Sequence, residues 1–297
     1  MKVAVTGGTG TIGSALVEEL RDRGDDVAVL SRGGRGDSFR WADPNADPPP
    51  ADALRGRDAV VHLAGEPLAQ RWSDDAKREI RDSRVLGTRN LVAALRDLPE
   101  EDRPRTLVSQ SAVGVYGARG DEPLDESAPA GDDFLAEVVA GWEAEARAAE
   151  ELGIRVVTTR TGVVLSKSGG ALERMLPPFK LGAGGPVAGG RQYVPWIHLD
   201  DVVGAMLFCL DKEGASGPIN LMAPEPVTNK DLSKALGRVL GRPAVAPVPG
   251  LAVKLLYGEM AMVVTTGQRA VPKKLQELGY EFRQPELDAA LRRALET

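Results

Sequence analysis

Residues 2–13 read KVAVTGGTGTIG, an apolar run followed by glycines at positions 7, 10 and 13. The run Lys2–Thr6 is typical of a buried strand, and a helical pattern follows over Ile12–Arg23. Gly7 allows a tight turn, Gly10 lets the backbone approach a pyrophosphate, and Gly13 permits close packing of the helix. The amino end of a helix also attracts negative charge. The stretch therefore predicts a Rossmann-like loop that binds the phosphates of a dinucleotide.

Further apolar runs alternate with amphipathic stretches up to about residue 165. The runs predict strands at Asp26–Ser31, Ala59–Leu63, Thr106–Ser109 and Arg155–Arg160. The amphipathic stretches predict long helices over Asp74–Leu98 and Phe134–Leu152. Because this alternation is typical of βαβ units, we expect an α/β fold with a Rossmann-like, doubly wound parallel sheet.

The composition changes after this region, where glycine-rich segments begin. We expect residues 1–165 to form the Rossmann domain and residues 166–297 a smaller C-terminal α+β portion that closes over the substrate. Residues 196–222 are expected to return to the large domain, with a helix over Asp200–Leu210. Asp200 or Asp201 would cap the amino end of that helix.

The composition excludes several classes of protein. The chain has 297 residues, of which 42% are hydrophobic, and its 37 Lys and Arg against 43 Asp and Glu give a net charge of −6. Such a chain has no broad electropositive surface for nucleic acid. No apolar stretch approaches the roughly 18 residues of a membrane span. Cys209 is the single cysteine, and no signal-peptide pattern is present, so we expect a cytoplasmic protein. One cysteine and two histidines are too few and too dispersed for a structural zinc site, so we expect no metal site.

The end of the second predicted strand decides the kind of dinucleotide. Residues 30–35 read LSRGGR, with no acidic residue to accept hydrogen bonds from the ribose of NAD. Arg32 can pair with a 2′-phosphate, Ser31 can donate a hydrogen bond to it, and Arg35 adds charge. This pattern favours NADP(H) over NAD(H). The alternative is that Arg32 and Arg35 are solvated charges of a loop.

Several motifs carry a resemblance to a known superfamily. Residues 6–13 (TGGTGTIG), 58–65 (DAVVHLAG), 109–117 (SQSAVGVYG) and 196–201 (WIHLDD) resemble the extended and atypical short-chain dehydrogenases/reductases. Residues 65–67 (GEP), 134–137 (FLAE) and 267–272 (GQRAVP) resemble more narrowly the epimerase-like atypical subfamily, of the NAD-dependent epimerase/dehydratase type. The resemblance covers nearly the whole chain, and the C-terminal motif is specific to the subfamily. It implies binding of NADP(H).

The loop pattern and the resemblance together give the following candidate cofactor-binding residues: Gly7, Thr9, Gly10, Thr11, Ile12, Gly13, Ser31, Arg32, Leu63, Ala64, Glu79, Arg84 and Val163. Glu79 and Arg84 are five residues apart, so they do not share one face of a helix and should have separate roles. Their alternative role is that of ordinary surface charges.

The superfamily usually uses a tyrosine and a lysine four residues later to move the proton of the reacting hydroxyl. None of the four tyrosines here has a lysine at that spacing. Ser111 and Tyr116 follow the strand that usually carries the active-site serine, so we expect Ser111 to bind a substrate oxygen and Tyr116 to act as the acid. Alternatively, Tyr116 packs under the nicotinamide. Glu137 and His198 are weaker candidates for the base.

The segment after the glycine-rich region offers further aromatic and polar side chains. Gln192, Tyr193 and Trp196 could form a wall for a small polar ligand or a hydrophobic seam between the two portions.

Taken together, the sequence predicts an NADP(H)-binding oxidoreductase or nucleotide-sugar-epimerase-like protein that acts on a small carbonyl or hydroxyl compound. A non-catalytic NADP(H)-sensing protein is the main alternative, because the usual Tyr and Lys pair is missing. A protein that the cofactor only stabilises is a further one. The two long predicted helices could form a homodimer, or their apolar faces could simply pack on the sheet.

Overall fold

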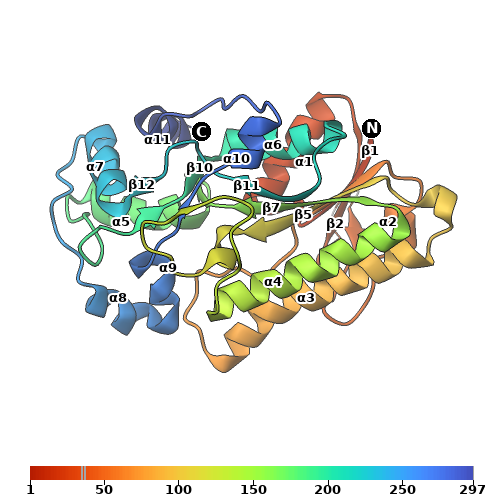
Figure 1. Ribbon diagram of the computed structural model, residues 1–297, viewed down its shortest axis with the longest axis horizontal. Helices are drawn as coiled ribbons and strands as arrows, with labels where there is room; N and C mark the ends of the chain where they lie inside the picture. Colours follow the sequence, from red (N-terminus) through yellow and green to blue (C-terminus); the bar gives the residue numbers. More distant parts are fainter. Residues whose placement is uncertain (35, 37, 297) are drawn as a thin grey trace.

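The computed structural model describes residues 1–34, 36 and 38–296, and at its centre lies a parallel sheet of seven strands (Figure 1). In sequence order these strands are β1 (Lys2–Thr6), β2 (Asp26–Ser31), β3 (Phe39–Arg40), β4 (Ala59–His62), β5 (Thr106–Ala112), β7 (Arg155–Thr161) and β11 (Gly217–Leu221). Their order across the sheet is β3-β2-β1-β4-β5-β7-β11, and every neighbouring pair is parallel. The chain reverses its direction of travel across the sheet between β1 and β4, which is where doubly wound sheets bind ligands. The predicted fold class is confirmed.

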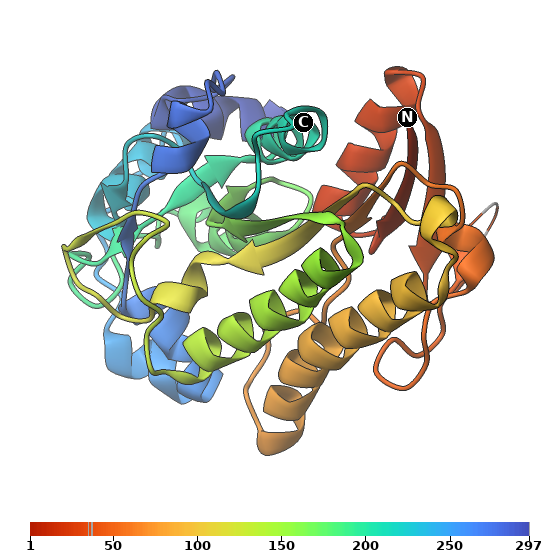
Figure 2. The same ribbon diagram turned by 45° about the vertical axis from the view of Figure 1, so that its right-hand side comes forward.

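Helices cover both faces of this sheet. Helices α1 (Thr11–Asp22) and α6 (Leu199–Asp211) pack on one face, where their apolar side chains join those of β1 and β4. Helices α3 (Asp74–Asp97) and α4 (Phe134–Arg147) lie side by side on the other face (Figure 2), with the short α2 (Ala51–Leu54) near them. Both faces are buried, which explains the nearly continuous apolar runs of the strands.

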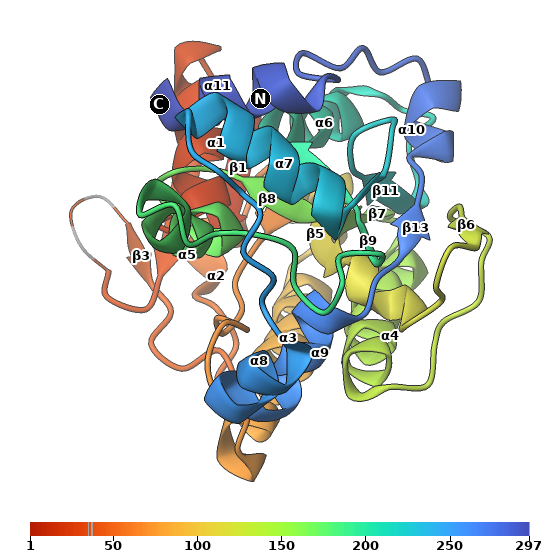
Figure 3. The same ribbon diagram turned by 90° about the vertical axis from the view of Figure 1, so that its left-hand side faces the viewer.

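The C-terminal elements gather at one end of the sheet (Figure 3). Their helices are α5 (Gly170–Lys180), α7 (Asn229–Leu240), α8 (Gly250–Tyr257), α9 (Met262–Thr265), α10 (Lys273–Glu277) and α11 (Leu287–Glu296). Their strands are β8 (Val163–Leu165), β9 (Tyr193–Val194), β10 (Trp196–His198), β12 (Val227–Thr228) and β13 (Arg269–Ala270), which pairs with β6 (Pro123–Leu124). A separate core joins α5, α7 and α11 with β8 and β10. Strand β11 returns to the large sheet beside β7, within the stretch expected to do so.

Two predicted elements end more than one residue away from where the structure ends them. The strand predicted over Thr106–Ser109 continues to Ala112, because β7 pairs with it as far as Thr161. The helix predicted over Phe134–Leu152 ends at Arg147 and tightens into a 3₁₀ helix over Ala148–Leu152.

The cap of α6 is also different from the prediction. His198, and not an aspartate, caps this helix, because its Nδ1 accepts a hydrogen bond from the Asp200 amide at 3.1 Å. Asp201 is buried and instead accepts hydrogen bonds from the Tyr280 hydroxyl and from the amides of Arg283 and Gln284. The acid therefore fastens the C-terminal segment to α6.

Among the described residues, no helix is both long and apolar enough to cross a membrane. The outer helices α3 and α4 contact each other, for example through the Arg89–Glu145 ion pair at 2.6 Å. Dimerisation through them stays a prediction.

His62 ties the end of β4 to its surroundings. The ring is fully buried, with Nδ1 2.7 Å from the Thr6 hydroxyl and Nε2 3.0 Å from the Thr88 hydroxyl. The Thr6 oxygen also accepts hydrogen bonds from the amides of Leu63 and Ala64, so its own proton is directed to Nδ1, and Nε2–H donates to Thr88. Burial lowers the pKa of His62 from 6.5 to about 4.

This burial predicts a pH dependence of stability. The unfolded chain takes up a proton at His62 below about pH 6.5, whereas the folded protein does so only near pH 4. The free energy of unfolding should therefore fall as the pH is lowered from about 6.5 to about 4, and His62 should account for on the order of 3 kcal/mol of this loss. Urea unfolding across this pH range should show a shallower slope for His62→Gln. Equal slopes for His62→Gln and the wild type would contradict the lowered pKa of His62. His198→Gln, which removes the other buried histidine, serves as a comparison.

Candidate functional site

The glycine loop between β1 and α1 is formed by close contacts between backbones. Gly7 has a φ of +68°, and a Cβ on it would lie 2.8 Å from the Ala64 nitrogen. A Cβ on Gly13 would lie 2.2 Å from the Gly7 oxygen. Helix α1 begins after Gly10 without a side-chain cap and has no acidic residue in its first turn. The loop thus leaves the amino end of α1 open to an anion.

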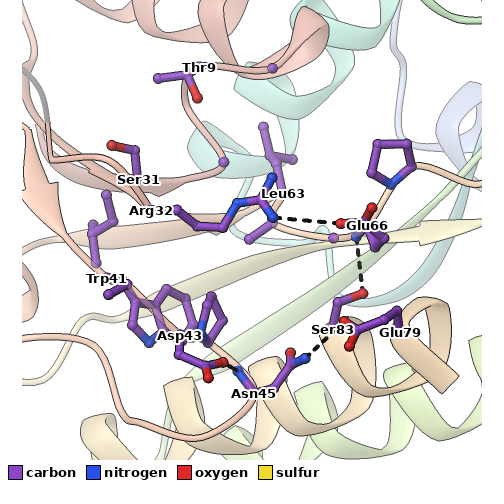
Figure 4. Close-up of a pocket in the computed structure, with 18 residues that line it drawn as sticks. Thr9, Ser31, Arg32, Trp41, Asp43, Asn45, Leu63, Glu66, Glu79 and Ser83 are labelled. Carbon is purple, nitrogen blue, oxygen red and sulfur yellow. Dashed lines mark hydrogen bonds and ion pairs between the residues drawn. The ribbon is translucent and has the colours of Figure 1, made fainter. Parts of the chain in front are cut away.

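A cleft of about 780 Å³ lies beside this loop, at the carboxyl ends of β1, β2 and β4. Figure 4 shows its wall, with Thr9 above, Ser31, Arg32 and Trp41 on one side and Glu66 on the other. Of the candidate cofactor-binding residues, the cleft is lined by Gly7, Thr9, Gly10, Ser31, Arg32, Leu63, Ala64 and Glu79. We call it the nucleotide cleft.

Arg32 is available to a ligand in this cleft. Its side chain is 74% exposed, and its Nη1 lies 3.6 Å from a Glu66 oxygen, a weak exposed ion pair (Figure 4). The Ser31 hydroxyl accepts a hydrogen bond from the Gly34 amide at 3.1 Å. Arg35 lies outside the described residues.

The remaining cofactor candidates lie elsewhere. Thr11 packs against Gly169, where a Cβ would be 2.3 Å from the threonine hydroxyl, and Ile12 packs on the core. Gly13 is buried in α1. Arg84 and Val163 line a second cavity.

Glu79 and Arg84 have separate surroundings, as their spacing predicts. Glu79 faces the nucleotide cleft and accepts a hydrogen bond from Asn45 at 3.4 Å. The Arg84 guanidinium donates to the backbone oxygens of Ile80 and Glu66, each at 3.0 Å, and lies over the Trp142 ring. Burial lowers the pKa of Arg84 to about 10.

The second cavity, of about 430 Å³, adjoins the nucleotide cleft. Both are lined by Leu63, Gly65, Glu66 and Pro67. Because Ser111 at the end of β5 lines the second cavity, we call it the Ser111 cavity.

A buried polar network lies behind Ser111. The Ser111 hydroxyl donates to Glu143 Oε1 at 2.6 Å, and Arg160 binds both carboxylate oxygens of Glu143, from Nε at 2.8 Å and from Nη2 at 2.9 Å. Arg160 Nη1 donates to the Tyr116 hydroxyl at 3.0 Å, which donates to Asn220 at 2.7 Å. Burial by itself would lower the pKa of Arg160, but the bonds to Glu143 outweigh it and the pKa is raised.

Tyr116 does not line the Ser111 cavity. Its side chain is fully buried and its hydroxyl is held between Arg160 and Asn220. Burial raises the pKa of Tyr116 despite the nearby guanidinium. The structure thus brings Ser111, but not Tyr116, to the place where a substrate could lie.

The weaker candidates are also separated. Glu137 is exposed on α4, and His198 is buried as the cap of α6. Of the predicted aromatic wall, Tyr193 lines the Ser111 cavity, whereas Trp196 lies in the C-terminal core and Gln192 donates to the oxygens of Val187 and Val264.

Sequence reasoning missed Glu143, which accepts from Ser111, and Arg160, which binds Glu143. The available signal was a charged residue on the apolar side of a helix and another within a buried strand, since charges in such places are usually paired. Within the part of the chain that the structure describes, no group of three or more His, Cys, Asp or Glu lies where it could hold a metal ion.

Family models match two stretches of the chain. Residues 3–221 match the NAD dependent epimerase/dehydratase family, and residues 248–294 match a domain of unknown function, DUF1731. The chain belongs to the NAD-dependent epimerase/dehydratase family. The resemblance seen in the sequence is thereby confirmed.

The similarity to known proteins covers nearly the whole chain. A chloroplastic homolog of the epimerase family protein SDR39U1 from Arabidopsis thaliana is 42% identical over 98% of this chain and 86% of its own length. The epimerase family protein Mb2239 of Mycobacterium bovis is 41% identical over 97% and 96%. The crystal structure of human SDR39U1 with NADPH covers 100% of this chain and 99% of its own, with 36% identity and a TM-score of 0.91. A cytoplasmic location stays a prediction.

The buried network predicts a large effect on stability. In Arg160→Ala, the Glu143 carboxylate stays buried without its cation, so the free energy of unfolding should fall by about 3–5 kcal/mol. Urea unfolding of the variant and the wild type measures this. Arg238→Ala, which removes an exposed pair with Asp288, is the control and should have a much smaller effect because water screens that pair. Similar losses in both variants would contradict the importance of the buried pair.

Proposed function

We propose that the protein binds NADP(H) in the nucleotide cleft and uses it to oxidise or reduce a small hydroxyl or carbonyl compound in the Ser111 cavity. The observation that carries this proposal is the junction of the two cavities. They share Leu63 and residues 65–67, so a ligand in one cavity can meet a ligand in the other.

The residues of the nucleotide cleft fit a phosphorylated dinucleotide. The glycine loop and the open end of α1 suit the pyrophosphate, and Arg32 suits a 2′-phosphate because it is exposed and only weakly paired. The backbone of Leu63 and Ala64 in the cleft wall lies against Gly7, where a side chain would clash with it. The NADPH in the structure of the human relative supports the same choice.

When bound, the nicotinamide supplies hydride exchange with a carbinol or carbonyl carbon. Ser111 supplies the contact to the substrate oxygen. Because the Ser111 proton is directed to Glu143, the Ser111 oxygen can accept a hydrogen bond from a substrate hydroxyl. As the carbinol carbon gives up its hydride, the hydroxyl proton would pass to Ser111 while the serine proton passes to Glu143, and reduction of a carbonyl would return the proton along the same path. Arg160 holds Glu143 in place, and Tyr116 supports Arg160. Tyr116 is thus proposed as a positioning residue.

A sensor of NADP(H) without turnover is the second candidate. It is favoured by the position of the Tyr116 hydroxyl, which lies buried against Asn220 and outside the cavity where a proton donor would be needed. Consumption of NADPH with a carbonyl compound separates the enzyme from the sensor.

Removal of Arg32 should weaken binding of the phosphorylated cofactor selectively. We expect Arg32→Ala to raise the Kd for NADPH by about ten-fold or more and to change the Kd for NADH little, because a charge-assisted contact to the 2′-phosphate is lost. Thermal-shift titrations with both cofactors measure this. Arg55→Ala, at an exposed pair with Asp102 outside the cleft, is the matched control. No shift of the wild type with either dinucleotide would refute the proposed function.

Removal of the Ser111 hydroxyl should affect turnover and not cofactor binding. For Ser111→Ala we expect kcat/KM to fall by about 10²-fold with an unchanged Kd for NADPH, because the contact to the substrate oxygen and the bond to Glu143 are removed and neither lies in the nucleotide cleft. Steady-state kinetics with a carbonyl compound that the wild type reduces measures this. Ser109→Ala, at a buried serine of the same strand that does not line the cavity, should behave like the wild type. Equal losses in both variants would show a structural effect.

A further inference from the structure

The Ser111 cavity has an apolar wall. Apolar residues of α4, β8, α9 and neighbouring segments supply most of its lining side chains, among them Leu135, Val139, Trp142, Val163, Met262 and Val264. A volume of about 430 Å³ suits a small organic molecule. Burial of apolar surface would therefore supply most of the binding free energy.

The charges of this cavity oppose an anionic ligand. Among the described residues that line it, the charged ones are Glu66, Arg84 and Asp133, so acids outnumber the single cation. That cation already donates to two backbone oxygens, and Asp133 caps α4 by accepting from the Ala136 amide. A nucleotide sugar brings a diphosphate, which proteins bind with Arg or Lys side chains or with an open helix terminus. In this lining the one guanidinium is already bonded, and Asp133 closes the amino end of α4.

The apolar lining reaches the surface of the protein through α9. Val263 and Val264 line the cavity and are also 44% and 39% exposed. Helix α8 lies beside this segment (Figure 3), and its Leu255 and Leu256 are also largely exposed. An apolar compound would thus meet apolar side chains from the surface to the floor of the cavity.

We propose that the Ser111 cavity takes an uncharged, largely apolar alcohol or carbonyl compound and rejects nucleotide sugars. The apolar body would lie against the walls from α4 and α9, and its oxygen would contact the Ser111 hydroxyl. That this ligand is the compound oxidised or reduced rests on the function proposed above. The preference for an uncharged ligand is a property of the cavity itself.

A competition experiment without cofactor tests this preference. The neutral fluorophore N-phenylnaphthylamine is bound to the full-length protein and displaced with octanol, octanoate or UDP. Octanol and octanoate share the chain length and differ in charge. We expect octanol to displace the probe at a concentration at least about ten-fold below that of octanoate, because a carboxylate must lose its hydration next to two acids. UDP should not displace it. Displacement by octanoate or UDP at the same or lower concentration than octanol would overturn the proposal.

Two matched variants locate the bound probe. Val264→Lys places a cation in the cavity wall and should reduce the preference for octanol over octanoate. Leu256→Lys places the same charge on the exposed apolar surface outside the cavity and should leave the preference unchanged. Loss of probe binding in Leu256→Lys alone would show that the probe binds to the outer surface, which would overturn the proposal.

The outcome is independent of the cofactor. If NADPH fails to bind in the thermal-shift titrations, the proposed function is lost, while the competition experiment still decides which ligands the cavity accepts. If NADPH binds and NADP⁺-dependent consumption of UDP-glucose is observed, the function stands and the inference is overturned.

Discussion

The close passage of two backbones at the carboxyl ends of β1 and β4 determines the rest of the site. Gly7 can meet Leu63 and Ala64 only because it lacks a side chain. The Thr6 hydroxyl holds the same crossing by accepting from both amides and by donating to His62. This crossing fixes the direction in which the chain leaves β4, and with it the wall that the nucleotide cleft and the Ser111 cavity share. A side chain at Gly7 would therefore disturb both cavities at once.

The two adjoining cavities differ in the kind of ligand they suit. The nucleotide cleft offers backbone amides at a helix terminus and an exposed guanidinium, which suit phosphates. The Ser111 cavity offers mostly apolar walls and the Ser111 hydroxyl, whose proton is directed to Glu143. Behind that hydroxyl, the Glu143–Arg160 pair is costly to bury. It is stabilised by the hydrogen bond that Ser111 donates to Glu143 and by the one that the Tyr116 hydroxyl accepts from Arg160. The pair fixes the direction of the Ser111 proton, and the serine side chain is fully buried.

The fold and the cofactor loop could be predicted from the sequence because they depend on neighbours along the chain. The glycine spacing after Lys2–Thr6 and the long amphipathic helices are local patterns. The position of the Tyr116 hydroxyl could not be predicted, because it depends on Asn220, which is 104 residues away, and on Arg160. The role of Asp201 was missed for the same reason, since its partners lie some 80 residues later in the chain. A short strand motif shows that a residue follows a strand, but not what will cover it.

The C-terminal segment explains how a common nucleotide-binding frame can acquire its own ligand preference. Residues 3–221 match the broad family model, whereas α8 and α9 lie in the separate match over residues 248–294. Helix α9 supplies three residues of the Ser111 cavity, Met262, Val263 and Val264, and all three are apolar. The segment that follows α10 is fastened to α6 by Asp201, so the chain is anchored beyond α9. The nucleotide cleft does not involve this segment, because its lining comes from the first 83 residues. Changes in α9 can therefore alter which compound enters the cavity without altering how the nucleotide is held.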